Sequence, residues 1–216
     1  VMIGITIAIV LNLFYDYEGQ RQDLIRYMRE TENQLQILLC ELAAYLHNKD
    51  MEINVWDRII AFEGRMHEFI KAAYDYQDNT FHSHPGYYID YFEMRLAQLQ
   101  VLHNLHYEIK KIRKMPKQAL VIADYIMYMA DYVVEMNIPD QQIEKLEEIS
   151  EQMKQEELPK TREEFEGRAL LYHILMDLEE FLVYKKRFVN GLDEKKLRIY
   201  WKQEMEQKDS ANELQK

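Results

Sequence analysis

The residues of this chain best suited to hold a metal ion are its seven histidines and their acidic neighbours. His103 and His106 are three residues apart, so they would share one face of a helix. Glu63 and His67 are four apart and would do the same. A di-iron bundle needs Glu-x-x-His on two helices, a motif that does not occur in the sequence, and the His-Ser-His segment at 82–84 is typical of an exposed loop. We therefore predict no metal site and no cofactor.

The sequence also lacks the motifs of nucleophilic and phosphate-transfer catalysis. It contains no Gly-x-Ser-x-Gly elbow, no phosphate-binding glycine loop and no His-Glu-x-x-His zinc motif. Cys40, the only cysteine, lies in an apolar helical run without a neighbouring base, which indicates a small core residue. A single cysteine excludes an internal disulfide and a cysteine-rich zinc site. We expect no catalytic residues.

Tyrosines and an arginine are the remaining candidates for binding a ligand. Among sixteen tyrosines, Tyr87, Tyr88 and Tyr91 cluster at the start of one predicted helix. Rings with a hydroxyl group can line a pocket for an aromatic ligand, although they also fill the irregular cores of helical bundles. Arg95 follows on the same helix, and an arginine without a protein partner is a natural partner for a carboxylate. Arg95 with the three tyrosines is the candidate site, and an aromatic carboxylate is the candidate ligand.

Charged residues in the core could instead pair with one another and fix the register of two helices. Arg95 and Arg168 each lie between apolar positions of a predicted helix. Asp177 and Glu180 flank apolar positions of the last predicted helix. The hypothetical structural pairs are Arg95 with Asp177 or Arg168 with Glu180. Because an unpaired buried charge is costly, such pairing is the simpler interpretation, and ligand binding by Arg95 is the alternative.

Composition indicates what kind of fold must position these residues. The chain has 216 residues, of which 48% are hydrophobic and 30% are charged, and this mixture is too apolar for a disordered protein. Six glycines and four prolines are too few for a turn-rich β fold or a doubly wound sheet. The formal net charge of −11 argues against nucleic acid as a partner. We predict an all-α protein.

Hydrophobic periodicity predicts a bundle of about six long antiparallel helices within residues 15–192, followed by a polar tail at 193–216 that is helical or frayed. The predicted helices cover about 23–50, 54–77, 87–114, 116–133, 139–157 and 161–190. Asn54 is a predicted N-cap, Thr161 and Glu164 form a predicted capping box, and Gly191 is expected to end the last helix at its C′ position.

The same periodicity assigns faces to the helices. On the first helix, Arg29 and Glu32 are placed on the polar side, opposite a single apolar stripe. Ile60 and Phe165 are expected in the core, on the second and the last helix.

Val1–Phe14 carries no charged residue, and as a helix it would be roughly 21 Å long, shorter than the hydrocarbon layer. It is apolar all round, is followed by aromatic residues, and then by arginines at 21, 26 and 29. We interpret residues 1–14 as the end of a transmembrane helix that leads into the cytoplasm. The alternative is a buried core helix of a soluble protein.

Three segments carry a resemblance to a known family. They are Tyr91–Arg95 with Gln98 and Leu99 following, Arg162–Ala169, and Leu175–Leu182 with Lys185. In this order, after an apolar segment that ends in Leu11-Asn12-Leu13, they resemble the C-terminal region of the putative aromatic acid exporter family of bacteria, which is similar to the fusaric-acid-resistance-like exporters. The resemblance covers nearly the whole chain.

The resemblance implies an all-α cytoplasmic domain of a bacterial inner-membrane exporter, tethered by residues 1–14 and partnered by the rest of the exporter polypeptide. Assembly, gating or substrate sensing would be its role, and no catalytic residues carry over from the family. Two alternatives come from other classes. One is a soluble bundle that binds a protein partner or forms a homodimer, with residues 1–14 as a core helix. The other is a cofactor-binding bundle enzyme.

Overall fold

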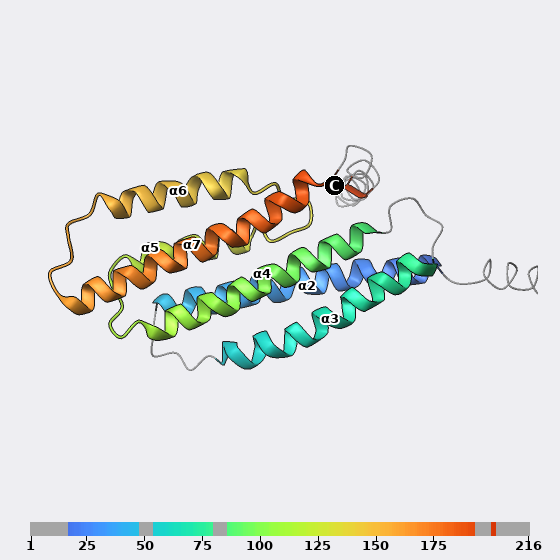
Figure 1. Ribbon diagram of the computed structural model, residues 1–216, viewed down its shortest axis with the longest axis horizontal. Helices are drawn as coiled ribbons and strands as arrows, with labels where there is room; N and C mark the ends of the chain where they lie inside the picture. Colours follow the sequence, from blue (N-terminus) through green and yellow to red (C-terminus); the bar gives the residue numbers. More distant parts are fainter. Residues whose placement is uncertain (1–16, 48–53, 80–85, 193–199, 202–216) are drawn as a thin grey trace, which may run out of the picture.

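The computed structural model describes residues 17–47, 54–79, 86–192, 200 and 201 (Figure 1). These residues form helices and connections without any strand, which confirms the predicted all-α bundle. The helices are α2 (Tyr17–His47), α3 (Val55–Asn79), α4 (Gly86–Lys111), α5 (Ala119–Ala130), α6 (Asp140–Lys154) and α7 (Arg162–Asn190).

Several predictions fall outside the described residues and stay predictions. They concern the transmembrane interpretation of 1–14, most of the polar tail at 193–216, and the histidines at 82–84. Among the described helices, none combines the length and the apolar composition that crossing a bilayer requires.

The helices lie along one long axis, and successive helices run in opposite directions (Figure 1). Helix α4 packs against α7 and α3, α2 packs against α5 and α3, and α6 lies on the outside against α7 and α5. This arrangement brings the start of α2, the start of α4 and the end of α7 to the same end of the bundle. The connection between α5 and α6, residues 131–139, lies at that end too.

Local capping explains where two of the helices begin. The backbone N–H of Asp57 donates to Asn54 Oδ1 at 3.3 Å, as predicted for the start of α3. At the start of α7, Thr161 has an extended backbone, and its Oγ1 accepts a hydrogen bond from the N–H of Glu164 at 3.1 Å. Gly191 follows the last residue of α7 with φ −78°, so the helix ends there without using the left-handed conformation open to glycine.

The apolar stripes bury one continuous core, with two corrections to the predicted positions. Ile60 is 44% exposed and Phe165 is 62% exposed. Near its start, α7 approaches the rest of the bundle through Gly167, where an added Cβ would lie only 2.9 Å from Pro116 Cγ. Phe165 is two residues away, on nearly the opposite side of the helix, so it points outward.

Candidate functional site

Five charged residues meet inside the bundle near the end where α2 begins. We call Arg29, Glu32, Arg95, Glu135 and Lys185 the buried charge cluster. Two of them come from α2, one from α4, one from the α5–α6 connection and one from α7. All except Arg29, at the rim, are buried. Four separate parts of the chain thus contribute to one charged group in a low-dielectric core, where each charge depends on its neighbours.

Arg95 lies at the centre of the cluster and is only 1% exposed. Its Nη2 lies 3.6 Å from Glu32 Oε1, its Nη1 donates to Gln98 Oε1 at 2.9 Å, and its Cζ lies 5.1 Å from the ring centroid of Tyr91. Its Nε and Nη2 have no hydrogen-bond acceptor. Since buried guanidinium groups normally have their N–H groups bonded, Arg95 retains the capacity to bind a further anionic group.

The position of the Gln98 amide follows from the packing of α4 against α7. Its Nε2 donates to the backbone carbonyl of Phe181 at 2.7 Å, and this bond turns Oε1 towards Arg95. Gln98 is itself buried, so the amide cannot turn to solvent. The guanidinium of Arg95 is therefore held on one side by a residue that α7 fixes in place.

The two carboxylates of the cluster are held by the rim arginine and by tyrosines. Arg29 donates from Nη1 to Glu32 Oε2 at 2.9 Å and from Nη2 to Glu135 Oε2 at 3.1 Å. The hydroxyl of Tyr91 donates to Glu32 Oε1 at 3.1 Å, and the hydroxyl of Tyr87 donates to Glu135 Oε1. Each carboxylate oxygen thus has at least one partner, so both glutamates are satisfied as anions.

Lys185 differs from the other members, because its Nζ donates to the backbone carbonyl of Glu135, which is a neutral acceptor. In the described part of the chain, this amine makes no ion pair, since the carboxylates are engaged by Arg29 and Arg95. Burial and the neighbouring charge of Arg95 lower the pKa of Lys185, whereas Glu135 and Glu32 raise it. The lowering effects are larger, so the pKa of Lys185 lies well below its usual value.

The three predicted tyrosines are neutral, and Tyr87 and Tyr91 act as hydrogen-bond donors. Burial raises the pKa of Tyr87, Tyr88 and Tyr91 far above the usual range, so none of them ionises near neutral pH. Tyr87 also stacks on Tyr200, with ring centroids 4.0 Å apart, and its hydroxyl accepts a hydrogen bond from Trp201 Nε1 at 3.3 Å.

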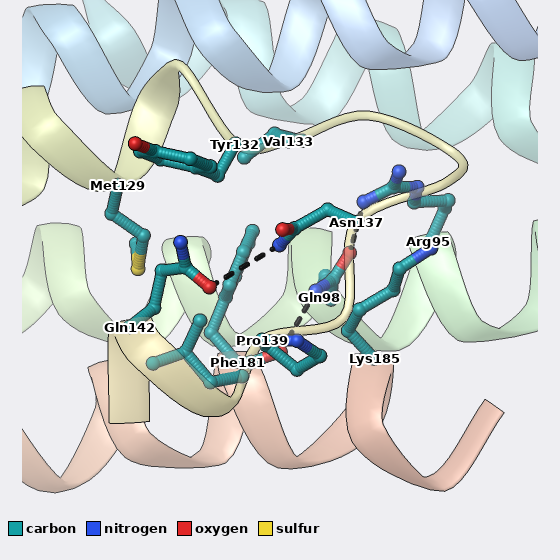
Figure 2. A pocket seen from close by; sticks show the side chains of 11 residues that line it. Arg95, Gln98, Met129, Tyr132, Val133, Asn137, Pro139, Gln142, Phe181 and Lys185 are labelled. Atoms are coloured by element: carbon teal, nitrogen blue, oxygen red, sulfur yellow. Dashed lines mark hydrogen bonds between the residues drawn. The ribbon is translucent and has the colours of Figure 1, made fainter. Parts of the chain in front are cut away.

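A small cavity adjoins Arg95 and Lys185 (Figure 2). Its volume is about 10 Å³, which is room for no more than one water molecule. Polar side chains on its wall include Gln98, Asn137 and Gln142, and the α5–α6 connection passes over it. Arg95 and Lys185 therefore face a small cavity with both polar and apolar walls, over which this connection passes.

The structure separates the four residues predicted to form the site. Arg95 and Tyr91 contact each other, and Tyr87 joins the cluster through Glu135. Tyr88 instead packs edge-on against Tyr76 and Tyr87, away from Arg95. None of the three tyrosines is among the residues that line the cavity beside Arg95.

The structure also corrects the hypothetical ion pairs. Arg95 pairs with Glu32 and not with Asp177. The packing of α4 on α7 places Lys185 beside Arg95, and Asp177 lies eight residues before Lys185 on α7. Arg168 pairs with Glu164 on its own helix, at 2.6 Å, and not with Glu180. Within the described ranges, Glu180 accepts its hydrogen bond from Tyr184.

Three members of the cluster were not found by sequence analysis. Glu32 was placed on the polar side of α2, yet it is buried. It follows Met28 by four residues and precedes Leu35 by three, so the edge of the apolar stripe was the available signal. Lys185 appeared only within a family-like segment, and Glu135 lies in a connection, where no periodicity marks a buried residue.

The histidine pair on α4 has a structural explanation. The ring of His103 packs edge-on against Trp56, with centroids 4.5 Å apart, and stacks on Tyr107. Burial lowers the pKa of His106. Among the residues that the structure describes, no three His, Cys, Asp or Glu side chains are grouped closely enough to hold a metal ion.

Comparisons with known proteins agree with the architecture. Residues 21–186 match the family described as "Putative aromatic acid exporter C-terminal domain". The uncharacterized protein YqjA of Bacillus subtilis (strain 168) is 26% identical over 190 residues, which are 87% of this chain and 58% of that protein. The chain thus spans less than two thirds of that relative's length. A crystal structure of a putative membrane protein from Clostridium difficile 630 has the same fold, with a TM-score of 0.67 and 24% sequence identity. The match covers 76% of this chain and 98% of the chain in that structure.

Proposed function

Because the chain belongs to the putative aromatic acid exporter C-terminal domain family, we propose that it is the cytoplasmic domain of a bacterial inner-membrane exporter and senses the exported aromatic acid. The proposed sensing group is Arg95, which would bind the carboxylate of the acid. The single observation that carries this assignment is a fully buried guanidinium, two of whose nitrogens lack an acceptor, beside a cavity whose wall includes side-chain amides.

The chemistry of the cavity fits a carboxylate. Arginine presents a planar fork of N–H donors that matches the two oxygens of this group. Gln98, Asn137 and Gln142 add side-chain amides around it. The apolar walls of Met129, Val133 and Phe181 suit the ring that follows the carboxylate.

Helix α2 is the proposed route from the site to the membrane. It carries Arg29 and Glu32, and it begins at Tyr17, shortly after the apolar segment 1–14. A carboxylate bound at Arg95 would compete with Glu32 for the same guanidinium. Weakening this contact between α2 and α4 would free α2 to shift, and this shift is the signal that we propose passes to the transport path.

Ligand entry requires the α5–α6 connection to move, because the cavity is too small for an aromatic ring. Glu135 holds this connection through Arg29 and Tyr87, and Lys185 holds it through the backbone carbonyl of Glu135. These contacts would have to break for the connection to open. The bound and free states would differ in the position of this connection.

Isothermal titration calorimetry with benzoate tests the proposal, with benzamide as the uncharged control ligand. We expect saturable benzoate binding and none of benzamide. Arg95→Met should weaken benzoate binding by about ten- to a hundredfold, because it removes a charged hydrogen bond. Arg65→Met is the surface control and should leave the benzoate affinity unchanged. Circular dichroism would verify that each variant is folded. Equal affinity of the wild type and Arg95→Met, or no heat with benzoate, would refute the sensing role.

A homodimer is a second candidate, and the outer face of α5 is the observation that favours it. Leu120, Val121 and Met127 are exposed along this face. Sedimentation equilibrium would show a dimer that Val121→Lys dissociates, and a monomeric wild type would exclude this candidate.

A further inference from the structure

We infer that the Arg95 site binds its anion together with one proton, and that Lys185 is the group that takes up this proton. The inference rests on the proposed function in that an anion must bind beside Arg95. It adds the regulation of that site: the domain would respond to pH as well as to the anion.

The position of the Lys185 amine is the first observation. Its side chain is 3% exposed, it lines the same cavity as Arg95, and its Nζ is bound to a backbone carbonyl. A neutral amine can make this bond as well as an ammonium group can. Burial without an ionic partner favours the neutral amine, which agrees with the lowered pKa of Lys185.

The balance of charge around Lys185 is the second observation. Helix α2 contributes Glu32 and Arg29, α4 contributes Arg95, and the α5–α6 connection contributes Glu135. Each of the two carboxylates already pairs with a guanidinium group, Glu32 with Arg29 and Arg95 and Glu135 with Arg29. A protonated Lys185 would add a second positive charge beside that of Arg95, without an ion pair of its own among the described residues, which is unfavourable.

A bound carboxylate reverses this preference. Its negative charge in the cavity would lie beside both Arg95 and Lys185 and would favour the ammonium form. The step forms no covalent bond: the Lys185 amine accepts a proton from solvent, and the resulting ammonium pairs with the incoming carboxylate. Anion and proton then enter together, so binding adds no net charge to the cluster.

Linkage fixes the sign of the pH dependence. Because the pKa of Lys185 is higher with the anion bound than without it, binding takes up a proton between the two values. In that window the affinity for the anion falls by up to tenfold for each pH unit of increase. A domain of this kind would release its ligand when the surrounding solution becomes more alkaline.

Calorimetry of the wild-type chain in two buffers tests this inference. Benzoate and formate, which stay ionised above pH 6, would each be titrated at several pH values around 7.5 in HEPES and in Tris, whose ionisation enthalpies differ and which supply no small anion comparable to the ligand. The difference in heat gives the number of protons taken up per anion. We expect uptake that approaches one proton at the pH values where Lys185 is neutral in the free chain and charged in the complex, and in that range an affinity that falls by up to about tenfold per pH unit.

Variants identify the group that takes up the proton. Lys185→Met should abolish both the uptake and the pH dependence. Lys186→Met is the matched control, since Lys186 is half-exposed and pairs with Asp140 at the surface, and it should keep both. If Lys185→Met does not fold, Lys185→Arg replaces it and should bind the anion without proton uptake.

Each outcome separates this inference from the proposed function. Benzoate binding without proton uptake, or uptake that survives in the folded Lys185 variant, overturns the inference and leaves the proposed function standing. Formate binding with one proton, but no benzoate binding, supports the inference and removes the aromatic ligand. If neither anion binds, both are overturned.

Discussion

Replacing Glu32 by glutamine tests whether the buried charge cluster holds α2 to α4. Glu32→Gln keeps the size of the side chain and removes the negative charge beside Arg95. The amide can still accept one hydrogen bond from Tyr91. The change therefore isolates the charge of Glu32 from its packing.

The expected loss of stability follows from the distance and the burial of the pair. At 3.6 Å and an effective dielectric constant of about 20, two unit charges attract by about 5 kcal/mol. Arg29 at the rim is 41% exposed, so solvent takes up part of its lost interaction. We expect Glu32→Gln to lower the free energy of unfolding by about 3 kcal/mol, in line with other broken buried pairs.

Glu30→Gln is the matched control on the same helix. Glu30 pairs with Arg65 at 2.7 Å, but both side chains are partly exposed, so this change should cost less than about 1 kcal/mol. Urea unfolding followed by circular dichroism measures both variants. With a slope of about 2 kcal/mol per molar urea, Glu32→Gln should lower the midpoint by about 1.5 M and Glu30→Gln by less than about 0.5 M. Equal shifts would refute a buried, mutually dependent cluster.

Two further predictions concern other parts of the bundle. Burial and neighbouring carboxylates raise the pKa of Asp177 to about 6, so the folded chain holds this proton more tightly than the unfolded chain. The contribution of Asp177 to stability should therefore fall as pH rises from about 4 to 6. Asp177→Asn should reduce the pH-dependent change in the free energy of unfolding by about 1 kcal/mol, after allowance for solvent screening. A pH profile of urea midpoints identical to that of the wild type would contradict this role of Asp177. Gly64→Ala, on the exposed face of α3, should stabilise the protein by about 0.5–1 kcal/mol, because no atom lies near the added Cβ. Gly167→Ala should destabilise the protein by about 1–3 kcal/mol, because the added Cβ would contact Pro116. Thermal unfolding that ranks these two variants the other way would refute the packing described for α7.

The helices could be predicted from the sequence because their causes are local. Spacing of apolar residues and the caps at Asn54 and Thr161 act within a few residues, and the structure places both caps as predicted. Phe165 shows the limit of this reasoning. Its spacing fits an apolar stripe, but the close approach of α7 at Gly167 depends on Pro116, which is distant in sequence.

The candidate site could be predicted only in part. Arg95 and its tyrosines stood out because a charge between apolar positions is unusual. Its partner could not be found in this way, since Glu32 reaches it only through the packing of α2 against α4. Glu135 and Lys185 join through the α5–α6 connection and the register of α7, which no local pattern specifies.

The most direct test of the account is to observe Arg95 itself while an aromatic acid is added. In a chain with ¹⁵N-labelled arginine, the Nε–Hε signal of Arg95, assigned by its loss in Arg95→Lys, would be followed by NMR during a benzoate titration. We predict a saturable shift of this signal, because the carboxylate would accept a hydrogen bond from a nitrogen that has no acceptor in the free chain. The signal of Arg65, at the surface, should stay in place. A signal of Arg95 that does not move, or shifts confined to exposed arginines, would contradict the sensing role of Arg95.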